Sequence, residues 1–348
     1  FLTLPAHKLK TSFTKVARCL RVARQILIVD AVATNRIVLK VKLAASYFSV
    51  EQAASITDAC AAARDHGPDL VICAMDLPDG SAADLCDRLR HHASTASIPV
   101  LVLVKHGDGA GRLTVLAAGG HDLPAQPVDD TLLLARVRSL IRAHNTVAEW
   151  NMRDDTCRAL GFAEDVAGFS PRGGRVMVCA DAASAQGWVA RLRPMMTCPL
   201  SHASPGTALR DLAPQEVPDV FAIAMGPDDA ARFAALRLLS AIRANASTQH
   251  AGVLVMQTNA DPQSAADALD LGADDLMTGG FVAEEVALRV RALLRRKRVA
   301  DRLRDTLRSG LQAAVSDPLT GLHNRRYAMP HLRRVADHAF AAGRPFAV

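Results

Sequence analysis

The sequence predicts two doubly wound α/β domains in tandem, each with a parallel sheet covered by helices on both faces. The first observation is composition, because 50% of the 348 residues are hydrophobic and only 4% are aromatic, as in layered α/β domains. The second is an internal repeat, in which residues 26–30 recur as residues 176–181. The third is a series of short continuous apolar runs, which are typical of parallel strands buried on both faces.

The repeat keeps its order and spacing along the chain. Three further pairs of segments match, namely 68–72 with 218–222, 100–103 with 253–256, and 120–123 with 273–276. The stretches between these strands show helical spacing, as in residues 133–141, where apolar residues follow at steps of one, three and four. We therefore expect five β–α units in each copy.

These boundaries predict a first domain at residues 25–144 and a second at 174–298. A connector rich in Gly and charged residues, 145–173, joins them. A linker helix follows at 299–316, and residues 317–348 begin a further α/β domain. Residues 1–24 lack clear periodicity, so we expect a disordered or foreign extension, and we expect the chain to be an excerpt of a longer protein.

Charge and cysteine content exclude several classes of protein. Six basic residues precede the first acid, Asp30, and beyond them basic and acidic residues are equal in number, which argues against nucleic-acid binding. Seven scattered cysteines without a C-x-x-C pair favour a reduced compartment over disulfides or zinc. No apolar run reaches the length of a membrane span, so we expect a cytoplasmic protein.

The order of the units and the residues at the strand ends resemble the receiver domains of two-component response regulators. In that family an Asp at the end of the third strand accepts a phosphoryl group, and two acids after the first strand hold Mg²⁺. A Thr or Ser after strand four and a Lys after strand five bind the phosphate. The resemblance implies a flavodoxin-like fold with these groups at the carboxyl ends of the strands.

At the positions that the resemblance indicates, the first domain has lost four of the five groups. The acidic pair retains only Asp30, and the phosphoacceptor position holds Ala74. The Thr or Ser position is Val104, and the Lys position is Gln126.

The second domain departs from the family in the same way. Its acidic pair retains only Asp181, its phosphoacceptor position holds Ala224, and Gln257 stands at the Thr or Ser position. Gly279 and Gly280 replace the Lys-Pro dipeptide. We therefore expect both domains to be pseudo-receivers, which keep the fold and lack the phosphoryl chemistry, and we expect no metal site.

Asp76 is a candidate displaced acceptor in the first domain. It lies two residues after Ala74, and strand side chains repeat with period two, so it could share a pocket with Asp30 and Asp79. The other interpretation is a solvated acid in an Asp-Leu-Pro-Asp-Gly turn, because such turn acids are common. We favour the turn, since without a Lys at position 126 a phosphate would lack its usual counter-charge.

Residues 317–326 read Asp-Pro-Leu-Thr-Gly-Leu-His-Asn-Arg-Arg and resemble the opening signature of GGDEF domains, which make cyclic di-GMP from GTP. Ordinary capping rules also predict a helix that starts here, with Asp317 at the N-cap and Pro318 in the first turn. The residues that match the motif are Asp317, Leu319, Thr320, Gly321, Leu322, Asn324, Arg325 and Arg326. The resemblance places the metal carboxylates and the GG(D/E)EF turn beyond Val348, so we expect no catalytic residue and no cyclase activity in this chain.

A helical pattern runs from about residue 281 to Val315, with apolar residues recurring every seven positions, which favours a seam against a partner helix. Its first part, with Val286, Val290 and Leu293, could instead pack on the sheet of the second domain. The residues that we expect in a dimer contact are Leu303, Leu307 and Leu311.

Two receivers followed by a GGDEF start resemble PleD-type diguanylate cyclases. The resemblance implies a dimeric response regulator of two-component signalling, linked to a histidine kinase or another signalling protein. GTP with Mg²⁺ and cyclic di-GMP would bind the output domain, and we expect no cofactor in the chain itself. The alternative is a non-catalytic cyclic di-GMP effector or localisation adaptor with a degenerate GGDEF domain.

Overall fold

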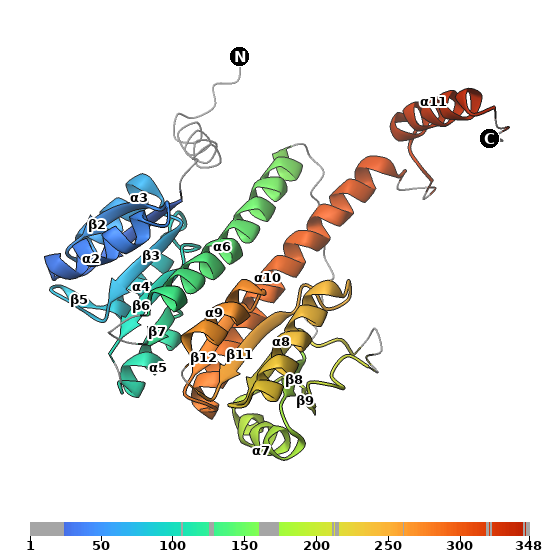
Figure 1. The fold of residues 1–348 in the computed structure, drawn as a ribbon. Helices are drawn as coiled ribbons and strands as arrows, with labels where there is room; N and C mark the ends of the chain where they lie inside the picture. Colours follow the sequence, from blue (N-terminus) through green and yellow to red (C-terminus); the bar gives the residue numbers. More distant parts are fainter. Residues whose placement is uncertain are drawn as a thin grey trace. The chain divides into compact units, whose positions relative to one another are not determined.

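The structure, a computed structural model, contains two five-stranded parallel sheets with helices packed on them (Figure 1). It describes residues 24–105, 107–124, 129–159, 174–210, 212, 216–259, 261–317, 320, 322–343 and 345. Both sheets belong to one compact unit, and a second unit contains residues 146–172 and 295–348. The sheet orders are β2-β1-β3-β6-β7 and β12-β11-β10-β8-β9, so the predicted internal repeat is confirmed as a repeat of parallel sheets.

The first domain has all five predicted β–α units and a small additional hairpin. Its elements are β1 (Gln25–Val29), α2 (Ala33–Ala44), β2 (Ser49–Ala53), α3 (Ile56–His66), β3 (Leu70–Ala74), the hairpin β4 (Asp76–Leu77) and β5 (Gly80–Ser81), α4 (Ala82–Arg90), β6 (Val100–Val104), α5 (Gly109–Ala117), β7 (His121–Pro124) and α6 (Asp130–Ala159).

The second domain departs from the prediction by one helix. Its elements are β8 (Val176–Cys179), α7 (Ala182–Leu192), η1 (Arg193–Met195), β9 (Leu200–Ala203), β10 (Val220–Met225), α8 (Asp229–Ala244), β11 (Gly252–Gln257), α9 (Pro262–Asp270), β12 (Asp275–Thr278) and α10 (Ala283–Val315). In the described part of the segment between β9 and β10, turns replace the expected helix. Pro205 and Gly206 account for this difference, because Pro and Gly disfavour helix interiors.

Alternate strand residues enter different cores, as expected for sheets covered on both faces. Ile26 and Ile28 of β1 pack with α2 and α6, whereas Leu27 and Val29 pack with α3 and α4. The core that contains α6 continues into the second domain, where it includes Leu239 of α8. The two domains therefore share one apolar cluster.

Two long helices leave the domains. Helix α6 continues to Ala159, so the first part of the predicted connector is helical rather than irregular. Helix α10 runs without a break from Ala283 to Val315 and includes the predicted linker helix. Val286, Val290 and Leu293 are buried in the core of the second domain, which confirms that this part of the heptad pattern packs on the domain's own sheet. Among the described helices, none is long and apolar enough to cross a bilayer.

After α10 the chain makes a tight turn instead of the helix start predicted at Asp317. Ser316 and His323 form an isolated β-bridge, and Asp317 N donates to Leu322 O at 2.7 Å. Helix α11 (Arg325–Ala341) begins later, with Asn324 as its N-cap. The Asp317 carboxylate accepts from Thr320 N at 2.9 Å within the turn, so the prediction assigned a real capping-type bond to the wrong element. Pro318, Leu319 and Gly321 lie outside the described residues.

Asp79 supports the start of α3, whose N-cap is Ser55. Its carboxylate accepts from Ile56 N at 2.8 Å and from Thr57 N at 3.0 Å. These bonds lower the pKa of the Asp79 carboxyl, with the Ile56 bond as the largest cause. A carboxyl whose pKa is lowered in the folded state contributes stability above its unfolded pKa, about 3.9, and this contribution is lost as the pH falls through the folded pKa.

We predict that Asp79→Asn lowers stability at pH 7 and that the difference from wild type shrinks as the pH falls below about 4, where the wild-type carboxylate is also neutralised. Urea unfolding midpoints at several pH values measure this difference, with the exposed α3 substitution Asp65→Asn as the control. A constant difference at all pH values would mean that the Asp79 charge does not hold the start of α3.

Candidate functional site

Asp30 stands at the carboxyl end of β1, where a receiver binds its metal, but its carboxylate is engaged within the loop before α2. Its side chain is only 4% exposed. One carboxylate oxygen accepts from Val32 N at 2.7 Å and the other from Asn35 Nδ2 at 3.0 Å. Arg36 donates to the Asp30 carbonyl oxygen at 2.6 Å. Both carboxylate oxygens are thus engaged in the loop before α2.

The donor set does not fit Mg²⁺, which requires several oxygen ligands at one point. Ala74 ends β3 with a methyl group where the family has its acceptor carboxylate. Cys73 cannot replace that nucleophile, because burial raises the pKa of its thiol well above the usual range. Within the described residues, no group of three or more His, Cys, Asp or Glu side chains could hold a metal. Gln126 lies outside the described residues.

Asp76 lies in the hairpin after β3, and its side chain is 75% exposed. Its carboxylate forms an ion pair with Lys105, whose Nζ lies 2.8 Å from Asp76 Oδ2. This hydrogen bond raises the pKa of the Lys105 ammonium. The sequence argument missed Lys105, although it directly follows Val104. Asp76 is thus exposed and has a cationic neighbour, whereas Asp30 is buried and its carboxylate accepts hydrogen bonds from Val32 and Asn35.

The corresponding edge of the second domain is also used for local structure. Asp181 caps α7 by accepting from Ser184 N at 3.0 Å, and this bond lowers the pKa of its carboxyl. Ala224 lies in β10 beside Met256. The carbonyl oxygen of Gln257 accepts from Gly279 N at 3.1 Å and Gly280 N at 3.0 Å, and both glycines have positive φ. A left-handed glycine pair therefore occupies the place of the family's Lys-Pro dipeptide.

A buried group of charged side chains joins the two domains. We call it the interdomain charge cluster, and it consists of Arg112, Arg136, Asp275, Glu285 and Arg289. Arg136 of α6 contacts the Asp275 carboxylate of β12. Arg289 NH1 donates to both Asp275 oxygens at 3.0 Å. Sequence reasoning did not find this cluster, because its first two members come from a different domain than the other three.

The second half of the cluster centres on Glu285. Arg289 Nε and NH2 donate to Glu285 Oε1 at 2.9 and 2.8 Å, and Arg112 NH1 lies 3.6 Å from Glu285 Oε2. The side chains of Arg136 and Arg289 are each 1% exposed. Burying such charges is unfavourable unless each has a close partner. Arg289 finds both carboxylates within its own domain, whereas Arg136 and Arg112 reach Asp275 and Glu285 only when the domains are together.

More exposed contacts surround the interdomain charge cluster. Arg138 of α6 pairs with Asp270 of α9, with about two fifths of each side chain exposed. Ser139 Oγ donates to Ala273 O at 3.1 Å, and Arg142 NH2 donates to Leu269 O at 2.7 Å. A shared apolar core, a buried ionic centre and a polar rim thus form the interface between the domains.

The expected output residues lie beyond this interface. Leu303, Leu307 and Leu311 are on α10, and Leu303 is partly exposed. The helix also carries ion pairs from Asp301 to Lys297 at 2.7 Å and to Arg304 at 2.9 Å. Asp317, Thr320, Leu322, Asn324, Arg325 and Arg326 lie in or just after the turn that joins α10 to α11.

We predict that the protein remains unmodified after incubation with acetyl phosphate and Mg²⁺, because Ala74 and Ala224 have no carboxylate. Intact mass spectrometry measures the result. A stable gain of about 80 Da, one phosphoryl group, would contradict the prediction. Loss of that gain in Asp76→Ala, but not in Asp79→Ala, would identify Asp76 as a displaced acceptor.

We predict that Asp275→Asn lowers the free energy of unfolding by about 3–5 kcal/mol, because it leaves the buried Arg136 without a carboxylate and removes one of the two carboxylates that Arg289 contacts. The matched control is Asp270→Asn at the exposed rim, for which we expect a loss of about 0–1 kcal/mol. Urea denaturation measures both values. Equal losses would mean that the buried centre contributes no more than the rim.

The comparisons with known proteins agree with this architecture. The response regulator receiver domain family matches residues 26–138. The response regulator PleD of Caulobacter vibrioides is 32% identical over 327 residues, which cover 92% of this chain and 70% of the relative. The phosphate regulon regulator PhoB of Rhizobium meliloti is 30% identical over 118 residues, or 34% of this chain and 52% of that protein.

Among solved structures, the signal receiver domain of a histidine kinase from Syntrophus aciditrophicus is 27% identical, with a TM-score of 0.33, and covers 34% of this chain and 91% of that one. The family match covers the first domain, and the similarity to the Caulobacter regulator extends over nearly the whole chain. The chain therefore belongs to the PleD-type response regulators.

Proposed function

We propose that the two domains act as pseudo-receivers that scaffold and dimerise a GGDEF diguanylate cyclase without phosphorylation. The observation that carries the proposal is the interdomain charge cluster. It holds the receivers together within one chain, while Ala74 and Ala224 occupy the phosphoacceptor positions. Because protein side chains already neutralise the buried charges between the two receivers, the receivers can pair without a bound phosphate.

The proposed output follows from the symmetry of cyclic di-GMP, which is built from two GTP molecules. Two GGDEF domains, each with GTP and Mg²⁺, must face each other, so catalysis depends largely on proximity and metal assistance. Helix α10 supports this role, because it is one continuous helix from the second receiver to the turn at residues 316–324. A contact through Leu303, Leu307 and Leu311 of two copies would bring their outputs together.

A second candidate function is a non-catalytic cyclic di-GMP effector or localisation adaptor. The loss of phosphoacceptors in both receivers favours it, since an output domain without a phosphorylation input can also lose its own chemistry. Incubation of the full-length protein with GTP and Mg²⁺ separates the candidates: formation of cyclic di-GMP supports the cyclase, whereas binding of cyclic di-GMP without synthesis supports the adaptor.

For the scaffold we predict a dimer at micromolar concentration that is unchanged by beryllofluoride or acetyl phosphate. The double substitution Leu303→Asp, Leu307→Asp should produce a monomer, because it places carboxylates in the expected apolar contact. Light scattering measures both states.

The control is Leu271→Asp, which changes a leucine that is 43% exposed outside this helix and should leave the dimer intact. A wild-type monomer would remove dimerisation from the proposal. A dimer that persists in the double variant would place the contact outside α10.

A further inference from the structure

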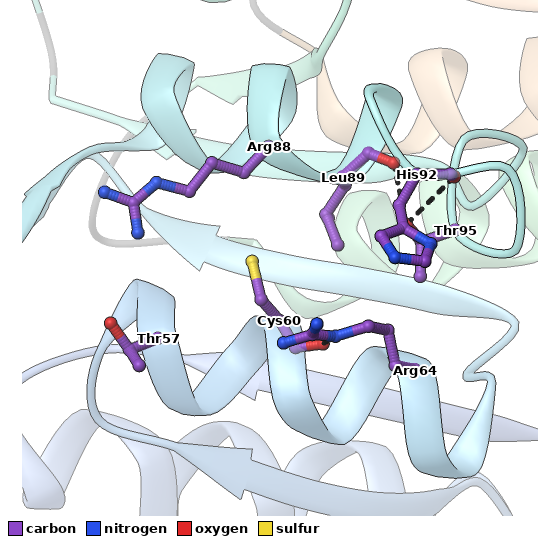
Figure 2. A pocket seen from close by; sticks show the side chains of 7 residues that line it. All are labelled: Thr57, Cys60, Arg64, Arg88, Leu89, His92 and Thr95. Atoms are coloured by element: carbon purple, nitrogen blue, oxygen red, sulfur yellow. Dashed lines mark hydrogen bonds between the residues drawn. The ribbon is translucent and has the colours of Figure 1, made fainter.

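A small groove lies between α3 and α4 on the first receiver domain, apart from the degenerate phosphoacceptor position (Figure 2). Its volume is about 240 Å³. The residues that line it are Thr57, Cys60, Arg64, Arg88, Leu89, His92 and Thr95. Asp30, Ala74 and Asp76 do not contribute to its walls, so the groove is a separate site.

Two arginines line the groove, one from each of its two walls. Figure 2 shows Arg64 on α3 and Arg88 on α4, with His92 on the same side as Arg88. Arg64 Nε donates to Cys60 O at 3.0 Å, which holds this guanidinium along α3. Within the described part of the chain, neither arginine forms an ion pair with a carboxylate, in contrast to Arg136 and Arg138 of the same domain.

The nearby acids Asp79 and Asp84 hydrogen-bond to helix starts, and Arg88 still acts on Asp84 through its charge. Asp79 accepts from the start of α3 and from Thr57 Oγ1 at 2.9 Å. Asp84, one turn before Arg88, accepts from Ser81 N at 2.8 Å and Ser81 Oγ at 2.7 Å in the capping box of α4. The hydrogen bonds of these carboxylates are thus directed at helix starts, and the guanidinium N–H groups that line the groove stay available to a ligand.

The thiol and hydroxyl groups that line the groove carry no charge. Burial raises the pKa of the Cys60 thiol, although Arg88 and Arg64 act in the opposite direction, so the thiol stays protonated at neutral pH. The Thr95 hydroxyl donates to Leu89 O at 2.7 Å. The donors left to a ligand are thus the guanidinium groups and the imidazole of His92.

We propose that this groove binds a phosphoryl group, as free phosphate or as a small phosphate monoester, through Arg64 and Arg88. The planar fork of arginine matches phosphate oxygens and forms paired, charge-assisted hydrogen bonds with them. The volume lies below the range of about 300–1,000 Å³ that is usual for drug-sized ligands, so the site fits a phosphoryl group rather than a whole nucleotide. This binding is independent of the scaffold role.

The test is calorimetric titration of the protein with inorganic phosphate at constant ionic strength. We expect saturable binding to the wild type, and a loss of affinity of about tenfold or more in Arg64→Gln and in Arg88→Gln, because each removes hydrogen bonds to a charged group. Lys40→Gln removes an exposed cation from α2 and should leave the affinity unchanged. Thermal unfolding confirms that the variants are folded.

A parallel titration with phosphoserine distinguishes the source of the phosphoryl group. Tighter binding of phosphoserine assigns the groove to monoesters, and tighter binding of phosphate assigns it to the free ion. Three results would overturn the proposal: no saturable binding of either probe, equal affinity in the arginine variants, or equally tight binding of acetate, which lacks the tetrahedral dianion. None of these results depends on the oligomeric state, so failure of the phosphate site would not contradict the scaffold proposal.

Discussion

The contact of Asp275 with Arg136 and Arg289 is the interaction on which the pairing of the receivers depends. One carboxylate, 3% exposed, serves a guanidinium from each domain. Separation of the domains would leave Asp275 with Arg289 alone and would leave Arg136 without its carboxylate. Because buried ions tolerate little misalignment, the cluster favours one arrangement of α6 against β12 and α10.

The same need for close partners explains the positions of several acids near the carboxyl ends of the strands. Asp30 closes the loop before α2, Asp181 caps α7, and Asp79 holds the start of α3. Each carboxylate satisfies backbone N–H groups that would otherwise lack partners at a helix start. These acids therefore have structural roles, and their presence is not by itself a sign of phosphotransfer.

Helix α10 connects the paired receivers to the output end of the chain. Its first turns are part of the second core through Val286 and Val290, and its last turn joins the bridged turn around Ser316 and His323. A helix without an internal break transmits a rotation or displacement more directly than a flexible linker does. In the proposed scaffold, the stiffness of α10 takes the place of a phosphorylation switch.

The sequence by itself determined the α/β class, the repeated series of apolar strands and the family, and it predicts the loss of the phosphoacceptors at Ala74 and Ala224. These properties depend on periodic burial and on residue identity, which can be read along the chain. The turns between β9 and β10, which contain Pro205 and Gly206, and the late start of α11 after its N-cap Asn324 were not foreseen, because local residue preferences and competing hydrogen bonds decide such boundaries.

Only the tertiary structure decided which charges meet. Arg136 and Asp275 belong to different domains, and Lys105 and Asp76 follow different strands. In sequence each of them resembles a solvated surface residue. Their roles appear only when packing removes water from one pair and leaves the other exposed, since the strength of an ion pair depends on the surrounding dielectric.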